Sequence, residues 1–253
     1  MFKLKTSNKG NLKAFARWMQ QLLGRLGIVL AIAFSGTALG VFGVGIFGLE
    51  LAIAPAYGEN LAHLQQVLRN EVCPRCDLSY APLSRANLDY AYLTEAYLVG
   101  ANLRKAHLTQ GHFDKACAIG ADFEQAEGDR IDFSEADLSG VNFNKSRFQG
   151  GNFHRATLIK AQFVNADLTT ADLSKSDLRD SQLHRADLRD SNLTQANLAF
   201  ANLSEADLRG AKLSEADLRA ANLKGAIVAG AELTGANLCG ATWVDGTETH
   251  QGC

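Results

Sequence analysis

The chain has 253 residues, a formal net charge of −2 and five cysteines. Its length fits one large domain or two small ones. The charge is uneven, because six Lys or Arg residues and one acid lie within residues 1–56, which leaves a net charge of −7 on the remainder. A mildly acidic body argues against binding to a phosphate backbone through clustered Lys and Arg, so no nucleic-acid partner is expected.

Residues 1–25 are a basic segment, and residues 26–49 are an uncharged apolar stretch of 24 residues. This stretch is long enough to cross a bilayer as a helix. A basic segment before an apolar one stays in the cytoplasm, so the chain that follows is directed across the membrane. Ala54-Pro55-Ala56 has the A-x-A pattern that signal peptidase cleaves. The stretch is therefore a cleaved signal or a retained anchor, and both place the following residues outside the cytoplasm, in a thylakoid lumen or periplasm.

Residues 50–75 contain a candidate capping helix. Asn60 is a favourable N-cap residue. Apolar residues then recur at helical spacing: Leu61, Leu64, Val67 and Leu68. The sequence predicts a short helix over about 60–71 whose apolar side covers the start of the next domain.

Residues 76–245 are a five-residue repeat without an insertion. Steps of five from Leu78 to Trp243 meet Leu or Phe at all but four positions, and the position two residues earlier is usually Ala. Five residues rotate a side chain by about 140° on a helix and move it to the opposite face of a strand. All the Leu and Phe can point inward only if the chain turns at every repeat, which predicts a solenoid.

The number of repeats in one coil follows from two columns of Phe. Their members lie at intervals of twenty residues: Phe113, Phe133 and Phe153 in one column, and Phe123, Phe143 and Phe163 in the other. Twenty residues are four repeats, so we expect a square cross-section with the Phe columns on opposite sides. Ala118 and Gly128 then occupy the other two sides of one coil and leave space for the rings.

Outward positions are also matched at this spacing. One edge alternates in charge: Glu95, Lys115, Glu135 and Arg155. A second column is rich in amides, which can hydrogen-bond between coils: Asn102, Asp122, Asn142, Gln162, Gln182, Asn202 and Asn222. Glycines recur at one corner, where a turn with positive φ favours them: Gly100, Gly120 and Gly140.

The repeat unit, seen in Ala206-Asp207-Leu208-Arg209-Gly210, resembles the A(D/N)LXX unit of the pentapeptide-repeat family over about residues 76–245. This resemblance implies an all-β fold, the right-handed quadrilateral β-helix. It also implies a protein that is not an enzyme, because most members have no known biochemical activity. The export signal with Glu59-Asn60-Leu61 and the following CxxC is similar to lumenal or periplasmic cyanobacterial members.

The cysteines allow several uses. Cys73 and Cys76 form a CxxC, which suits a disulfide, half of a zinc site or a redox pair. A zinc site needs two further ligands, and redox catalysis lacks its usual βαβ setting, so we expect a structural disulfide in an oxidising compartment. Cys239 and Cys253 can join the last coil to the tail, residues 246–253, which is otherwise expected to be loose. This scheme leaves Cys117 unpaired.

Other polar residues give no catalytic, metal or cofactor site. The six histidines do not share one column at neighbouring coils. Asp167, Asp187 and Asp207 do share a column and suit a cation, but Arg189 and Arg209 are placed to offset their charge. A flat ladder of side chains also lacks the pocket that would exclude water from a catalytic group.

The best interaction candidates are four tyrosines at outward positions in the first coils: Tyr80, Tyr90, Tyr92 and Tyr97. Exposed aromatic clusters are typical of partner surfaces, although packing against the capping helix is an alternative. We expect an exported scaffold that binds another protein, with a membrane contact through the N-terminal segment if uncleaved, and a homodimer as one possible state. The alternatives are a DNA-shaped inhibitor of topoisomerases, as the family includes in the cytoplasm, and a CxxC redox or metal protein.

Overall fold

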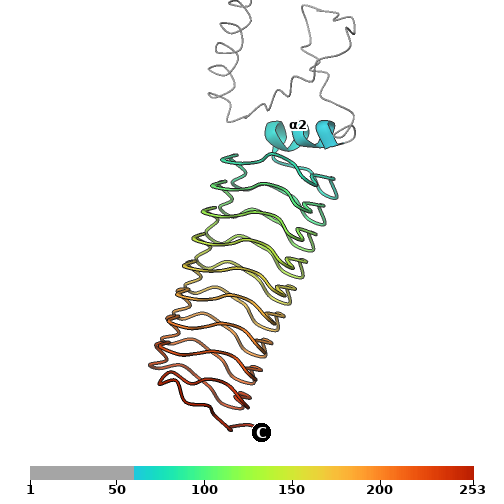
Figure 1. Cartoon of the computed structure of the whole chain (residues 1–253). Helices are drawn as coiled ribbons and strands as arrows, with labels where there is room; N and C mark the ends of the chain where they lie inside the picture. Colours follow the sequence, from blue (N-terminus) through green and yellow to red (C-terminus); the bar gives the residue numbers. More distant parts are fainter. Residues whose placement is uncertain (1–59) are drawn as a thin grey trace, which may run out of the picture. The chain divides into compact units, whose positions relative to one another are not determined.

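The computed structural model describes residues 60–253; residues 1–59, with the expected signal or anchor over 26–49, lie outside the described residues. The described residues belong to one compact unit, Glu59–Cys253. In it, helix α2 (Asn60–Asn70) lies across the first coil of a solenoid, and the C-terminus lies at the other end (Figure 1). Within residues 60–253, the structure contains no helix with the length and apolarity that a membrane span requires.

The coils contain twenty residues each. Up to Asn222, each outward residue that precedes an inward position forms a one-residue parallel β-bridge with its equivalent twenty positions later, as Asp77 does with Tyr97. The bridges run from Val72 to Thr242. Leu78 N donates to Tyr97 O at 2.7 Å, and Tyr97 N donates to Cys76 O at 2.8 Å. Because the chain turns at every repeat, the bridges do not lengthen into strands, and the predicted four-repeat coil is confirmed.

The corners share one turn geometry. Ala81 N donates to Leu78 O at 3.0 Å, and Tyr80, the third residue of this turn, has φ of 58°. The predicted positive φ at Gly100 is confirmed, at 62°. Lys105 shows the same conformation, at 58°, so glycine is not required. The hydrogen bond from Lys105 N to Glu124 O, at 3.0 Å, helps to hold this sparsely populated conformation in place.

Four faces surround the axis, and we number them by the first inward residue of each: face 1 from Leu78, face 2 from Leu83, face 3 from Leu88 and face 4 from Leu93. Each inward column continues at intervals of twenty residues. The inward Leu and Phe side chains are almost completely buried, except Leu233 near the C-terminal end, which is partly buried. The residues immediately before and after an inward residue point outward, and the next residue forms the corner.

The two Phe columns meet at the axis, as predicted. On face 2, the ring of Phe143 lies 5.0 Å from the rings of both Phe123 and Phe163, centroid to centroid. It also contacts Phe133 on face 4 at 5.8 Å and Phe148 on face 3 at 5.1 Å. Phe143 is therefore a central member of the aromatic core.

Gly128 makes room for a different ring from the one expected. A Cβ at this position would lie 2.9 Å from Cε1 of Phe148 and 3.1 Å from Cβ of Leu108. All three residues belong to the inward column of face 3. The space left by Gly128 is therefore filled by the ring of Phe148, which lies in the next coil of the same column.

Helix α2 covers the first coil, which has no preceding coil whose carbonyl groups could accept hydrogen bonds from its backbone amides. Val67 is completely buried against the first coil, and Gln66 Nε2 donates to Val72 O at 2.9 Å. Asp77 N, which has no coil before it, donates instead to Nδ1 of His63 at 3.1 Å. His63 therefore has a structural role at the junction of α2 and the first coil.

The tail closes the last coil and is not the loose segment that the sequence suggested. Thr242 and Glu248 form an antiparallel bridge. Amides of the last coil donate to tail carbonyls at 2.7 to 3.0 Å: Leu238 N to Gln251 O, Gly240 N to Thr249 O, and Trp243 N to Thr247 O. The tail is ordered because it supplies the acceptors that a further coil would provide.

Candidate functional site

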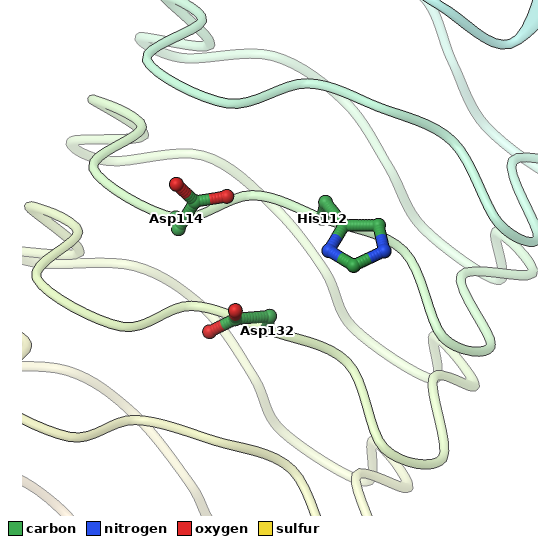
Figure 2. A group of neighbouring side chains, drawn as sticks. All are labelled: His112, Asp114 and Asp132. Carbon is green, nitrogen blue, oxygen red and sulfur yellow. The ribbon is translucent and has the colours of Figure 1, made fainter.

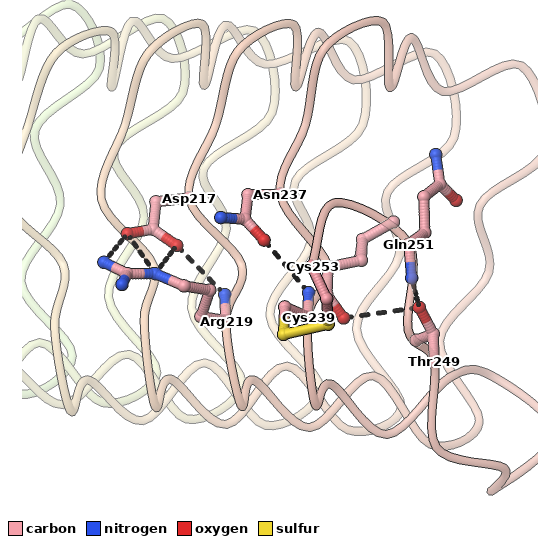
Figure 3. The surroundings of a disulfide bond; sticks show 8 residues. Asp217, Arg219, Asn237, Cys239, Thr249, Gln251 and Cys253 are labelled. Atoms are coloured by element: carbon pink, nitrogen blue, oxygen red, sulfur yellow. Dashed lines mark hydrogen bonds and ion pairs between the residues drawn. A yellow bond between two sulfur atoms is a disulfide. The ribbon is translucent and has the colours of Figure 1, made fainter.

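The two cysteine pairs lie at the two ends of the solenoid. Cys73 and Cys76 are joined by a disulfide with a Cα–Cα distance of 5.4 Å, and both are buried where α2 meets the first coil. Cys239 and Cys253 are joined with a Cα–Cα distance of 4.9 Å, beside the hydrogen bond from Thr249 Oγ1 to Leu238 O (Figure 3). Cys117 is free and half-buried on face 1. The two disulfides are therefore placed to stabilise the two ends of the solenoid.

On face 3, arginines form ion pairs with Asp187 and Asp207. Arg189 Nη2 lies 2.6 Å from Oδ2 of Asp187, and Arg189 Nε lies 3.8 Å from Oδ2 of Asp207. Arg209 pairs with Asp207 as well, and its hydrogen bond is the main reason that the pKa of Asp207 is lowered. These Arg residues occupy the place that a cation would take in the column of Asp167, Asp187 and Asp207.

The amide column of face 2 links several coils. Asn142 Nδ2 donates to Asp122 Oδ1 at 3.0 Å, and Asn202 Nδ2 donates to Gln182 Oε1 at 3.2 Å. Near the start of the column, Arg104 links two coils instead, because its Nη1 donates to Asp122 Oδ2 at 3.1 Å. This face therefore serves cohesion between coils, as its residue types suggested.

The four predicted tyrosines form two pairs on neighbouring faces. Tyr97 points outward on face 1 and Tyr80 lies at the corner after it, whereas Tyr92 points outward on face 4 and Tyr90 lies at the corner before it. All four are more than half exposed. Among the described residues no ring contact joins the two pairs, and the corner between faces 4 and 1 carries the ion pair of Arg75 and Glu95, 2.7 Å.

Face 1 carries an apolar strip that we define as Tyr97, Val99, Cys117 and Ile119. Tyr97 and Cys117 are paired across two consecutive coils, and Val99 and Ile119 follow them on the same face. Tyr97 is 54% exposed and Ile119 is 41% exposed, although both are large apolar side chains. Tyr80 extends the strip at the corner, so one pair of the predicted tyrosines belongs to a longer apolar surface.

Face 4 brings together His112, Asp114 and Asp132, which the sequence analysis did not connect (Figure 2). His112 and Asp132 are bridged across consecutive coils, and Asp114 is the next outward residue after His112. Comparison of the histidines with one another missed this group, because it contains a single histidine. A comparison of all potential ligands at intervals of twenty residues would have found it.

The corner between faces 3 and 4 holds a shallow recess of about 430 Å³ lined by Gln110, Asp129, Arg130, Gln149 and Thr170, among others. Its lining is polar, and it contains neither His nor Cys. Enclosed apolar walls with a few convergent polar groups are typical of small-molecule sites. The recess lacks such walls and therefore does not have the features of a small-molecule site.

The repeats match the family of pentapeptide repeats in eight copies, over residues 76–113, 86–125, 136–174, 176–214 and 216–242. This chain belongs to the pentapeptide-repeat family. Membership accounts for the four-sided coils and supports the right-handed β-helix solenoid that the repeat unit implied. A search of curated proteins found no match.

Solved structures of other pentapeptide-repeat proteins are similar to the chain. HetL of the cyanobacterium Nostoc sp. strain PCC 7120, involved in heterocyst differentiation regulation, is 30% identical over 76% of this chain and 98% of its own, with a TM-score of 0.35. A protein of the Arabidopsis thaliana thylakoid lumen is 36% identical over 38% of this chain and 67% of its own, with a TM-score of 0.37. QnrB1, a plasmid-mediated fluoroquinolone resistance protein, is 28% identical over 53% and 71%, with a TM-score of 0.37.

Proposed function

We propose that this pentapeptide-repeat protein is a non-enzymatic scaffold that binds another protein through the apolar strip of face 1. The observation that carries the proposal is the exposure of Tyr97 and Ile119 on consecutive coils of one face. Aromatic and aliphatic anchors at the centre of an interface supply much of its binding energy. Tyr80 at the adjoining corner extends the surface on which such a partner would rest.

The rigidity of the coils supports this role. Outward side chains of neighbouring coils lie about 4.8 Å apart, which is the spacing of hydrogen-bonded strands. Backbone hydrogen bonds on both sides of each outward residue, such as Cys117 N to Ala96 O at 2.9 Å and Leu98 N to Cys117 O at 2.7 Å, hold its position. A partner therefore meets preorganised anchors and loses little free energy in ordering them.

Photo-crosslinking tests the partner face. A photoreactive phenylalanine analogue at position 119 is expected to form a covalent adduct with one partner in the native membrane fraction. The same analogue at position 200 is the control, because Phe200 is also an exposed apolar residue, 64% exposed, but lies at the corner after face 1 about four coils further along the solenoid. In the position-119 protein, Tyr97→Ser should reduce adduct yield at least about tenfold, as loss of an anchor worth about 1.4 kcal/mol would.

Tyr90→Ser separates the two tyrosine pairs in the same experiment. Tyr90 has an exposed fraction, 57%, close to that of Tyr97, 54%, but it lies at the edge of face 4. We expect Tyr90→Ser to leave the adduct at position 119 unchanged. Equal adducts at positions 119 and 200, or loss of the adduct in both variants, would refute face 1 as the partner surface.

We further propose that the solenoid is exported across a membrane. The basic residues 1–25 and the apolar residues 26–49 support export, and two cysteine pairs at bonding distance suit an oxidising compartment. Protein from native cells, denatured and alkylated without reductant, should take up label at Cys117 alone, as measured by mass spectrometry. Label on all five cysteines would show a reducing compartment and contradict export.

A DNA-shaped inhibitor of topoisomerases fits the charges less well. The 34 repeats make about 8.5 coils, which at about 4.8 Å each form a rod of about 40 Å. DNA carries one negative charge per about 1.7 Å, so such a rod would need roughly 24 charges to match it. Residues 57–253 carry a net charge of −7. Arginines also pair with aspartates on the outward faces, as Arg219 does with Asp217 at 2.6 Å.

A further inference from the structure

The group on face 4 has the geometry of a set of metal ligands. One ligand atom each from His112, Asp114 and Asp132 lies within 4.8 Å of the other two. Two ligands that bind one zinc ion at about 2.1 Å are separated by at most about 4.2 Å. Small side-chain rotations therefore suffice to bring all three onto one ion. Figure 2 shows the imidazole and both carboxylates on the outward side of two consecutive coils.

Neighbouring groups orient all three side chains. The ring of His112 stacks on that of Tyr92, with 4.6 Å between centroids and 13° between planes. Thr94 Oγ1 donates to Asp114 Oδ1 at 2.7 Å. Each ligand is thus supported by a residue of another coil, which is the role that outer-shell residues play in metal sites.

Asp132 is held by its own repeat and by the next coil. Ser134 N donates to Asp132 Oδ1 at 2.9 Å, and Asn152 Nδ2 donates to the same oxygen at 3.0 Å. Among the residues that the structure describes, no hydrogen bond engages Oδ2 of Asp132 or Oδ2 of Asp114. One oxygen of each carboxylate is therefore fixed and the other is available to a ligand.

The charge of face 4 also favours a cation. Its outward positions from Val72 to Thr194 contain no Lys or Arg. The other faces pair carboxylates with arginines: Arg179 and Arg219 on face 1, Arg104 on face 2, and Arg147, Arg189 and Arg209 on face 3. Asp114 and Asp132 have no such partner within 4.0 Å among the described residues. A bound divalent cation would supply the charge that Arg supplies elsewhere.

We propose that His112, Asp114 and Asp132 bind one divalent first-row transition-metal ion of the zinc type. One imidazole nitrogen and two carboxylate oxygens suit such ions, whereas Ca²⁺ and Mg²⁺ prefer oxygen ligands alone. Water completes the coordination, because the site lies on an open face. Since His112 and Asp132 belong to consecutive coils, the ion links these two coils. The site lies on face 4 and the apolar strip lies on face 1, so binding of the ion does not depend on the proposed partner.

Calorimetric titration of the full chain with Zn²⁺ tests this proposal. The protein is prepared without a polyhistidine tag and treated with a chelator. We expect one equivalent of Zn²⁺ to bind, and we expect Co²⁺ to give visible absorption bands at the same stoichiometry. Loss of an outer-shell group typically costs about 10- to 100-fold in affinity, so Asp132→Asn, which alters a ligand itself, should cost at least about tenfold.

Asp172→Asn is the matched control. Asp172 lies in the column of Asp132, and Ser174 N and Asn192 Nδ2 donate to its Oδ1 at 2.9 and 3.1 Å, as their equivalents do at Asp132. Asn already occupies this column at Asn152 and Asn192, so both variants should fold. Asp172→Asn should bind Zn²⁺ like the unaltered protein. No binding by the unaltered protein, or equal affinities in the two variants, would overturn the proposal.

Discussion

Phe143→Ala is expected to lower the free energy of unfolding by about 3–5 kcal/mol, the usual cost of removing a buried Phe side chain. The ring is completely buried and contacts five other Phe rings: Phe123, Phe133, Phe148, Phe153 and Phe163. Alanine would leave a cavity that coils tied by backbone hydrogen bonds on both sides cannot collapse. Denaturation by guanidinium chloride, followed by circular dichroism, measures the loss.

Phe143→Leu is the control for this experiment. Leu is the usual inward residue of the repeats, and it fills most of the same space. We expect a cost well below that of Phe143→Ala, about 1–1.5 kcal/mol. A cost below about 1 kcal/mol for Phe143→Ala itself would be incompatible with a packed aromatic core at this level.

Gly128→Leu is expected to destabilise the protein by about 3 kcal/mol, although it restores the usual residue of the repeat. The Cβ alone would lie 2.9 Å from the ring of Phe148 and 3.1 Å from Leu108, so a full Leu side chain overpacks the column. The same denaturation experiment measures the effect. Gly128→Leu with unchanged or increased stability would show that the ring of Phe148 does not occupy this space.

The sequence predicted the solenoid well because one period governs both its core and its surface. Inward Leu and Phe at every fifth position require a turn per repeat, and Phe at every twentieth position sets the coil. Both inferences depend on residues that lie along one column. The structure confirms them through bridges such as Asp77 to Tyr97 and through the contact between the rings of Phe123 and Phe143, twenty residues apart.

Features that depend on backbone hydrogen bonds, or on residues from two adjacent columns, could not be predicted from the sequence. The tail is ordered because its carbonyl groups, such as that of Gln251, accept hydrogen bonds from amides of the last coil. The Gly-rich, polar composition of the tail does not reveal these hydrogen bonds. Positive φ at Lys105 is set by stacking of coils and not by the residue type. The ligand group on face 4 combines the column of His112 and Asp132 with the adjacent column of Asp114.

The twenty-residue register underlies every face described above, and a double-mutant cycle between Gly128 and Phe148 tests it most directly. These residues are neighbours in one column only if a coil contains four repeats. We predict that Phe148→Leu relieves the overpacking of Gly128→Leu, with a coupling free energy of about 1–3 kcal/mol in the denaturation experiment. A coupling below about 0.5 kcal/mol, together with a large coupling between Gly128→Leu and Phe143→Leu, would instead indicate fifteen residues per coil and contradict the account.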